Sequence, residues 1–148
     1  MSRAPRAVVC PDEEATRREG ATLAGALPPG ALVSLEGDLG AGKTVFVRVL
    51  AEGLGIDAAA VSSPTFVLAV EHRGARPLLH CDLYRLPEGA GIDDLGVEEA
   101  LADGFTVAVE WGERMPEWLR RTAWRVLLAP APLAGPEARA LTIIPPAE

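Results

Sequence analysis

Short apolar runs and amphipathic segments alternate along this chain of 148 residues, as they do in mixed α/β proteins. The apolar runs are bounded by glycine, proline or charged residues, which is typical of strands. They predict strands over residues 31–36, 66–70, 78–84, 105–109, 124–128 and 140–144. Helices are predicted over residues 12–27, 44–52, 93–102 and 116–121.

Two of these runs indicate how the strands are arranged. The run at 105–109 is almost continuously apolar, which favours a strand covered on both faces. The link between 66–70 and 78–84 is too short for a crossover, so this pair is predicted to be antiparallel. We therefore predict one α/β domain over residues 1–148, with a mixed central sheet and flanking helices. Residues 1–10 are predicted to be flexible, and 145–148 to form a tail.

The segment between the first predicted strand and the helix after it carries a specific motif. Residues 37–44, Gly-Asp-Leu-Gly-Ala-Gly-Lys-Thr, match the P-loop pattern G-x-x-x-x-G-K-[ST], whose backbone N–H groups cradle phosphates. Lys43 is the only lysine in the chain, and the other thirteen basic residues are arginine. A compact ammonium suits this position better than a planar guanidinium. We predict a P-loop nucleoside triphosphate hydrolase fold that binds the nucleotide with Asp38, Leu39, Gly40, Ala41, Gly42, Lys43 and Thr44.

A magnesium ion at such a loop needs an acidic group beside the Thr44 hydroxyl, usually at the end of an apolar strand. Asp82 and Glu110 both close predicted strands. The more uniformly apolar strand before Glu110 favours a central position, so Thr44 and Glu110 are the predicted metal ligands. Asp82 is then predicted to orient the attacking water or a metal-bound water. Thr65 lies on a loop that can approach the magnesium or the γ-phosphate, and with Lys43 it completes the predicted catalytic set.

Composition narrows the choice of nucleotide and of partner. The chain contains no asparagine and no glutamine, so it lacks the guanine motif and the water-orienting glutamine of Ras-like GTPases. ATP is therefore favoured, with slow hydrolysis unless a partner completes the site. The net charge of −7 argues against a direct, sequence-independent grip on nucleic acid. The acidic stretch between Arg85 and Arg114 fits either a solvated helix face or a surface for a basic partner protein.

Targeting signals are not evident in the sequence. The longest apolar runs are too short to span a bilayer, and residues 1–10 lack the apolar stretch of a signal peptide. The two cysteines, Cys10 and Cys81, have no metal-binding or redox spacing, and Cys81 is predicted to be a core residue. We predict a reduced, cytoplasmic protein without a membrane partner.

Four motifs, in this order and at this spacing, resemble those of the bacterial TsaE (YjeE) family. They are the P-loop at 37–44, Ser-Pro-Thr-Phe at 63–66, His-Cys-Asp-Leu-Tyr-Arg-Leu at 80–86 and Val-Glu-Trp at 109–111. The resemblance extends from about residue 11 to residue 144. That family supplies the ATPase component of tRNA threonylcarbamoyladenosine synthesis.

The resemblance implies roles for individual residues and a function for the chain. Lys43 and Thr44 would contact phosphate and Mg²⁺, Glu110 would lie on the metal side, and Asp82 and Thr65 would lie near the γ-phosphate. Trp111 is functionally important in that family, although a core aromatic is an equally good interpretation of it. The implied function is an ATPase that acts on the TsaB–TsaD protein pair, which would itself contact the tRNA.

Two other functions remain open from the sequence. The chain could be a stand-alone P-loop kinase for a small molecule, although it lacks an arginine-rich lid segment. It could also be a nucleotide-gated binding module with negligible turnover.

Overall fold

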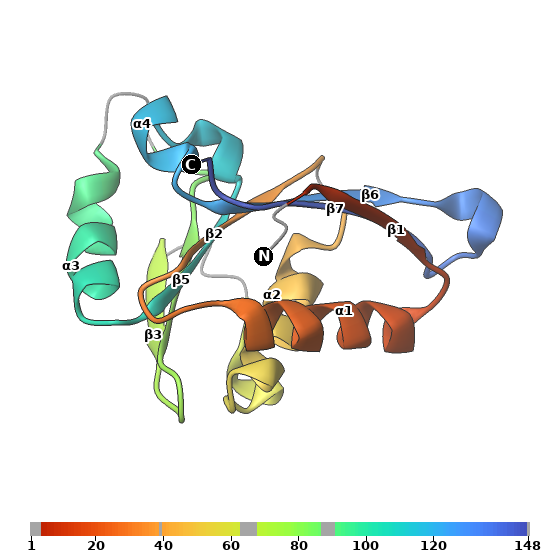
Figure 1. The fold of residues 1–148 in the computed structure, drawn as a ribbon, viewed down its shortest axis with the longest axis horizontal. Coiled ribbons are helices and arrows are strands. Elements are labelled where there is room, and N and C mark those ends of the chain that lie inside the picture. Colours follow the sequence, from red (N-terminus) through yellow and green to blue (C-terminus); the bar gives the residue numbers. More distant parts are fainter. Residues whose placement is uncertain (1–3, 39, 63–67, 87–90, 148) are drawn as a thin grey trace.

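Among the residues that the structure describes, one mixed sheet of seven strands forms the centre of the molecule (Figure 1). The structure is a computed structural model that describes residues 4–38, 40–62, 68–86 and 91–147. The strand order is β1-β7-β6-β2-β5-β4-β3. The strands are β1 (Arg6–Cys10), β2 (Leu32–Glu36), β3 (Ala69–His72), β4 (Leu78–Asp82), β5 (Thr106–Glu110), β6 (Trp124–Pro130) and β7 (Arg139–Ile144).

The middle of the sheet is parallel and its edges are antiparallel. β2 pairs in parallel with β5 on one side and β6 on the other, and β4 continues the parallel part beyond β5. β3 closes one edge, and β7 followed by β1 closes the other. Every residue of β2, β4 and β5 is buried, which confirms the prediction of a covered central strand at 105–109. The predicted antiparallel hairpin is confirmed as β3 and β4.

Helices cover both faces of the sheet. The α-helices are α1 (Glu13–Ala26), α2 (Lys43–Gly53), α3 (Val97–Ala102) and α4 (Glu117–Arg120). α1 and α2 pack on one face around Phe46 and Leu50, whereas α3 and α4 pack on the other around Val97 and Leu119 (Figure 1). Single 3-10 turns lie at Ala58–Ala60, Ile92–Leu95, Gly112–Arg114 and Pro132–Ala134.

The start of α1 agrees with its sequence signal. The Asp12 side chain accepts a hydrogen bond from the Ala15 N–H at 2.8 Å, and Glu13 and Glu14 lie in the first turn. Arg76 holds the other end, because its guanidinium donates to the carbonyl oxygens of Ala24 and Leu27. These contacts offset the weak helix propensity that glycine gives this segment.

Two expectations from the sequence were wrong in detail. Residues 1–10 were expected to be flexible, but β1 pairs with β7 from Arg6 onward, and Cys10 is buried against α1. The continuous helix expected over 93–102 is divided at Gly96, whose φ of 77° ends one 3-10 turn and begins α3. The strand expected at 66–70 falls partly on residues outside those described, and β3 begins at Ala69.

A buried ion cluster fixes the end of β2, where the P-loop begins. The Glu36 carboxylate accepts hydrogen bonds from Arg120 on α4, Arg125 on β6 and the Ser34 hydroxyl. Burial alone would raise the pKa of the Glu36 carboxyl, but these hydrogen bonds outweigh burial and lower it to about 2. The cluster therefore ties α4 and β6 to the residue directly before Gly37.

We expect Glu36→Gln to lower the free energy of unfolding by about 3 kcal/mol at pH 7, because it leaves two partly buried guanidiniums without their anion. The pKa of Glu36 is lower in the folded state than its ordinary value of 4.5. Its contribution is therefore complete above pH 4.5 and is lost as the pH falls toward 2. Urea unfolding at pH 7 and at pH 3 should show a smaller difference between wild type and variant at pH 3.

Glu117→Gln is the matched control for this experiment. Glu117 also contacts Arg120, at 3.9 Å, but its side chain is 79% exposed. The same chemical change there should alter the free energy of unfolding by less than about 0.5 kcal/mol. Equal losses in the two variants would contradict a special role for the Glu36 cluster.

Candidate functional site

The loop between β2 and α2 has the backbone shape of a phosphate cradle. Gly40 and Gly42 have φ values of 80° and 98°, in the left-handed region that favours glycine. Among the described residues no side chain caps α2, which begins at Lys43, so its first N–H groups are left open. Open N–H groups at a helix N-terminus attract anions, and a phosphate fits this end of α2. Leu39 lies outside the described residues.

Lys43 is held inside this loop. Its ammonium donates to the carbonyl oxygens of Gly37 at 2.6 Å and Asp38 at 2.9 Å. The same nitrogen lies 3.9 Å from the centroid of the Trp111 ring. Burial lowers the pKa of the Lys43 ammonium, and nearby carboxylates, Glu113 first among them, oppose that shift.

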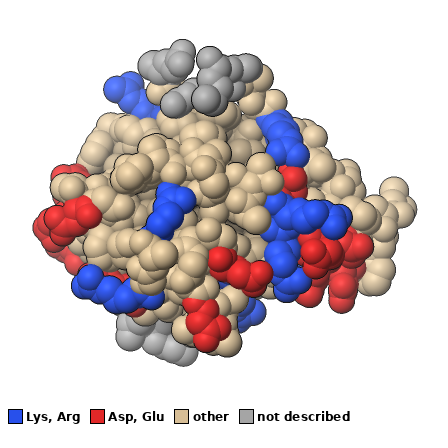
Figure 2. Space-filling view, turned by 60° about the horizontal axis from the view of Figure 1, so that its bottom comes forward, with Lys and Arg blue, Asp and Glu red and all other residues tan. Residues whose placement is uncertain are grey.

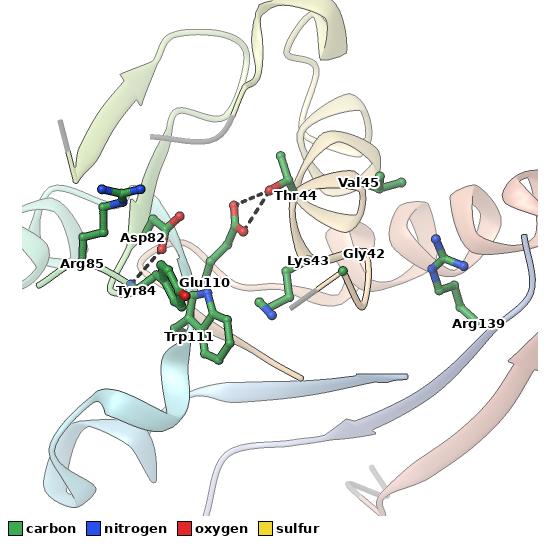
Figure 3. Close-up of a pocket in the computed structure, with 11 residues that line it drawn as sticks. Gly42, Lys43, Thr44, Val45, Asp82, Tyr84, Arg85, Glu110, Trp111 and Arg139 are labelled. Atoms are coloured by element: carbon green, nitrogen blue, oxygen red, sulfur yellow. Dashed lines mark hydrogen bonds between the residues drawn. The ribbon is translucent and has the colours of Figure 1, made fainter. Parts of the chain in front are cut away.

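Thr44 and Glu110 meet across the end of the sheet, as Figure 3 shows. The Thr44 hydroxyl lies 2.9 Å from Oε1 and 3.0 Å from Oε2 of Glu110. Glu110 ends β5, directly beside β2, and its side chain is buried. The predicted central position of the Glu110 strand is therefore confirmed.

The oxygen donors of this pair fit magnesium. Hydroxyl and carboxylate oxygens are the ligands that Mg²⁺ prefers, and at P-loops few protein ligands are needed because phosphates and water complete the shell. The described residues contain no cluster of three His, Cys, Asp or Glu side chains that could hold a metal by themselves.

Asp82 lies next to Glu110 at the same edge of the sheet. The two residues are register partners on parallel strands, so the carboxyl ends of β4 and β5 bring both acids together. Oδ1 of Asp82 accepts the backbone N–H of Tyr84 at 2.9 Å, which orients the carboxylate at the strand end (Figure 3). Thr65, the remaining predicted catalytic residue, lies outside the described residues.

The turn after β5 places an aromatic ring at the site. Trp111 adopts the left-handed conformation, with φ 60° and ψ 40°, which is uncommon for a bulky residue. Its ring lies 5.0 Å from that of Tyr84, and Arg114 lies near both rings. Gly112 follows and packs on Ser34 so closely that a Cβ there would lie 1.8 Å from the Ser34 hydroxyl oxygen. Trp111 therefore packs against the core and also lines the cleft.

These elements surround an open cleft of about 500 Å³. The P-loop forms one wall, Asp82 and Glu110 form the floor, and Tyr84, Arg85 and Trp111 form the opposite side (Figure 3). Arg139, from β7, extends the cleft along the far side of Gly42, where a Cβ would lie 2.8 Å from its Nε. This volume is in the range of small-ligand sites.

Sequence reasoning missed several residues at this site. Tyr84, Arg85 and Arg139 line the cleft without having been predicted to do so. His80, which lies 2.6 Å from Glu110, was quoted only as part of a motif. One signal could have found it, because residues two apart on a strand share a face, so His80 lies on the same side of β4 as Asp82.

Known proteins resemble this chain over most of its length. The family model described as "Threonylcarbamoyl adenosine biosynthesis protein TsaE" matches residues 10–133. A Treponema pallidum protein named tRNA threonylcarbamoyladenosine biosynthesis protein TsaE is 40% identical over 116 residues, which cover 76% of this chain and 85% of the relative. A Streptomyces coelicolor protein of the same name is 46% identical over 114 residues, covering 74% and 76%.

The chain belongs to the TsaE family. The crystal structure of Bacillus subtilis YdiB superimposes with a TM-score of 0.71 at 27% identity, covering 99% of this chain and 89% of that one. The fold is therefore the P-loop nucleoside triphosphate hydrolase fold, as predicted. TsaE relatives are named for tRNA threonylcarbamoyladenosine biosynthesis, and both family and fold are consistent with nucleotide binding. In the described part of this chain, no helix is both long and apolar enough to cross a membrane.

We expect the fluorescence of Trp111 to report nucleotide binding. Reaching a phosphate would draw the Lys43 ammonium away from the indole face, and this change in local field should alter the emission of the ring. Titrating ATP into a Trp118→Phe/Trp124→Phe variant leaves Trp111 as the only indole. The emission should change saturably in that variant and stay constant in a Trp111→Phe variant. A signal that persists without Trp111 would contradict this assignment.

Proposed function

We propose that this chain is a Mg²⁺-dependent ATPase that supports tRNA threonylcarbamoyladenosine modification by acting on the TsaB–TsaD pair, without modifying RNA itself. The observation that carries the proposal is the contact of Thr44 with Glu110 beside the loop that holds Lys43. A P-loop nucleotide site needs a phosphate cradle, a lysine and a metal-binding pair, and these groups occur here in one cleft.

Each predicted residue has a role in this proposal. The backbone of Asp38, Leu39, Gly40, Ala41 and Gly42 would cradle the phosphates at the N-terminus of α2. The Lys43 ammonium would exchange its two carbonyl acceptors for phosphate oxygens, which carry more negative charge. Thr44 and Glu110 would hold Mg²⁺, which when bound neutralises charge on the outer phosphates.

Asp82 and Thr65 are assigned to the hydrolytic step. Asp82 lies beside Glu110 at the edge of the sheet, and its carboxylate is fixed by the Tyr84 N–H. A carboxylate held there can accept a hydrogen bond from a water and so orient it toward the γ-phosphate. Thr65 would approach the γ-phosphate or the metal from its loop.

The charge distribution favours a protein partner over direct contact with tRNA. The net charge of −7 repels a polyanion. On the face covered by α1 and α2, basic and acidic side chains are interspersed rather than gathered in one basic field, as Figure 2 shows.

Cys10 and Cys81 are both buried free thiols, which agrees with a reducing compartment, and we place the protein in the cytoplasm.

We expect slow phosphate release from ATP by the chain alone, and faster release when the TsaB–TsaD pair is added. Lys43→Ala should lower the rate by roughly 100-fold or more, and Lys43→Arg should be nearly as severe because the fork cannot replace a point charge. A steady-state phosphate assay checks this. Phosphate transfer to a small molecule would instead indicate a kinase, and tight binding without turnover would indicate a nucleotide-gated module.

The two acids should differ in which step they affect. Glu110→Gln removes charge from the metal side, so it should weaken ATP binding in Mg²⁺ but not in EDTA. Asp82→Asn should leave binding close to normal and slow hydrolysis, because it acts on the water. Titrating ATP into both variants, followed by the phosphate assay, separates the steps. The opposite pattern would exchange the two roles.

A further inference from the structure

His80 is a buried polar residue next to the proposed metal ligands. It lies in the middle of β4, its side chain is 0% exposed, and Nε2 lies 2.6 Å from Oε2 of Glu110. A carboxylate only accepts hydrogen bonds, so Nε2 is the protonated nitrogen of this contact. Within the described residues, the Glu110 side chain therefore has two hydrogen-bond donors, His80 from β4 and Thr44 from α2.

The two donors, Thr44 and His80, differ in whether they fix the orientation of the Glu110 carboxylate. The Thr44 hydroxyl is within hydrogen-bond distance of both Glu110 oxygens, so it does not fix which way the carboxylate turns. The His80 contact reaches Oε2 only. It selects one rotation of a carboxylate whose terminal torsion is otherwise broad, and it leaves Oε1 toward the Thr44 hydroxyl.

Burial of His80 has a cost that packing does not explain. Its Nδ1 is buried without a hydrogen-bond partner among the described residues. An apolar side chain at this position would have no nitrogen to leave unpaired. The neighbours Leu79 and Cys81 supply the core packing of β4 on its opposite face. The hydrogen bond to Glu110 is the favourable interaction that offsets the unpaired atom.

We propose that His80 is a positioning residue, whose Nε2–H holds the Glu110 carboxylate in the orientation that binds Mg²⁺ together with Thr44. The proposal rests on the proposed metal-dependent nucleotide site and adds a residue to it. Groups that orient a metal ligand in this way affect metal affinity even though they do not contact the metal.

The test compares ATP affinity with Mg²⁺ and with EDTA, measured by titration calorimetry without turnover as a readout. The ratio of the two affinities is the magnesium-dependent gain. His80→Leu should reduce this gain by about tenfold or more and leave the affinity in EDTA unchanged. A purely structural role for His80 would lower both affinities together.

Two polar variants test the position of the donor. His80→Gln carries an N–H near the place of Nε2 and should keep most of the magnesium-dependent gain. His80→Asn carries its N–H near the place of Nδ1, out of reach of Glu110, and should lose it. This pair also decides the question if His80→Leu does not fold. Equal gains in His80→Gln and His80→Asn would overturn the proposal.

His72→Leu is the matched control. His72 lies on β3 of the same hairpin, where it pairs with Leu78, and it also has a buried nitrogen, Nε2, without a hydrogen-bond partner among the described residues. Its loss should leave the magnesium-dependent gain unchanged, and an equal reduction in His72→Leu would overturn the proposal. A wild-type protein without any gain would overturn the metal site itself. A wild-type gain shared by every His80 variant would overturn only the role of His80.

Discussion

The buried carboxylate of Glu110 is the group on which the site depends. It is 4% exposed, and a buried carboxylate is stable only with hydrogen-bond donors around it. Its donors come from two different elements, Thr44 from α2 and His80 from β4. They reach it because β5 lies between β2 and β4 in a parallel arrangement. The order of the central strands is therefore what assembles the site, and the helices hold that order in place.

The connection between fold and site runs through the end of β2. Ser34 packs directly against the turn at Gly112, and its hydroxyl donates a hydrogen bond to Glu36 at 2.8 Å. The Gly112 turn presents Trp111 to Lys43, while Glu36 anchors the first residue of the P-loop. A single small side chain thus touches both the ion cluster that stabilises the fold and the turn that shapes the cleft. Larger residues at Ser34 would displace one or the other.

Local patterns in the sequence predicted the motifs and strands that are determined by residues close together in the chain. They missed the contacts that form only when distant strands pair in the sheet. The P-loop, the central strands and the two strand-end acids follow from motif and periodicity, and the structure brings Thr44, Asp82 and Glu110 to one cleft. β1 was missed although Ala7 to Cys10 are apolar, because this strand joins the edge of the sheet by pairing with β7, which is far away in the sequence. The break in the helix at Gly96 was missed because it depends on the φ angle of one residue. The contact of His80 with Glu110 was missed because it depends on the register between β4 and β5.

Glu36 and Glu110 are both buried glutamates at the ends of adjacent strands, yet their surroundings differ in charge. Two guanidiniums neutralise Glu36, so that its charge is satisfied within the protein and its pKa is held at about 2. No arginine pairs with Glu110 among the described residues; its donors are a hydroxyl and an imidazole. The nearby Lys43 ammonium is instead bound to two carbonyl oxygens. The first carboxylate is thus suited to stability, whereas the surroundings of the second would suit the cation of the proposed magnesium site.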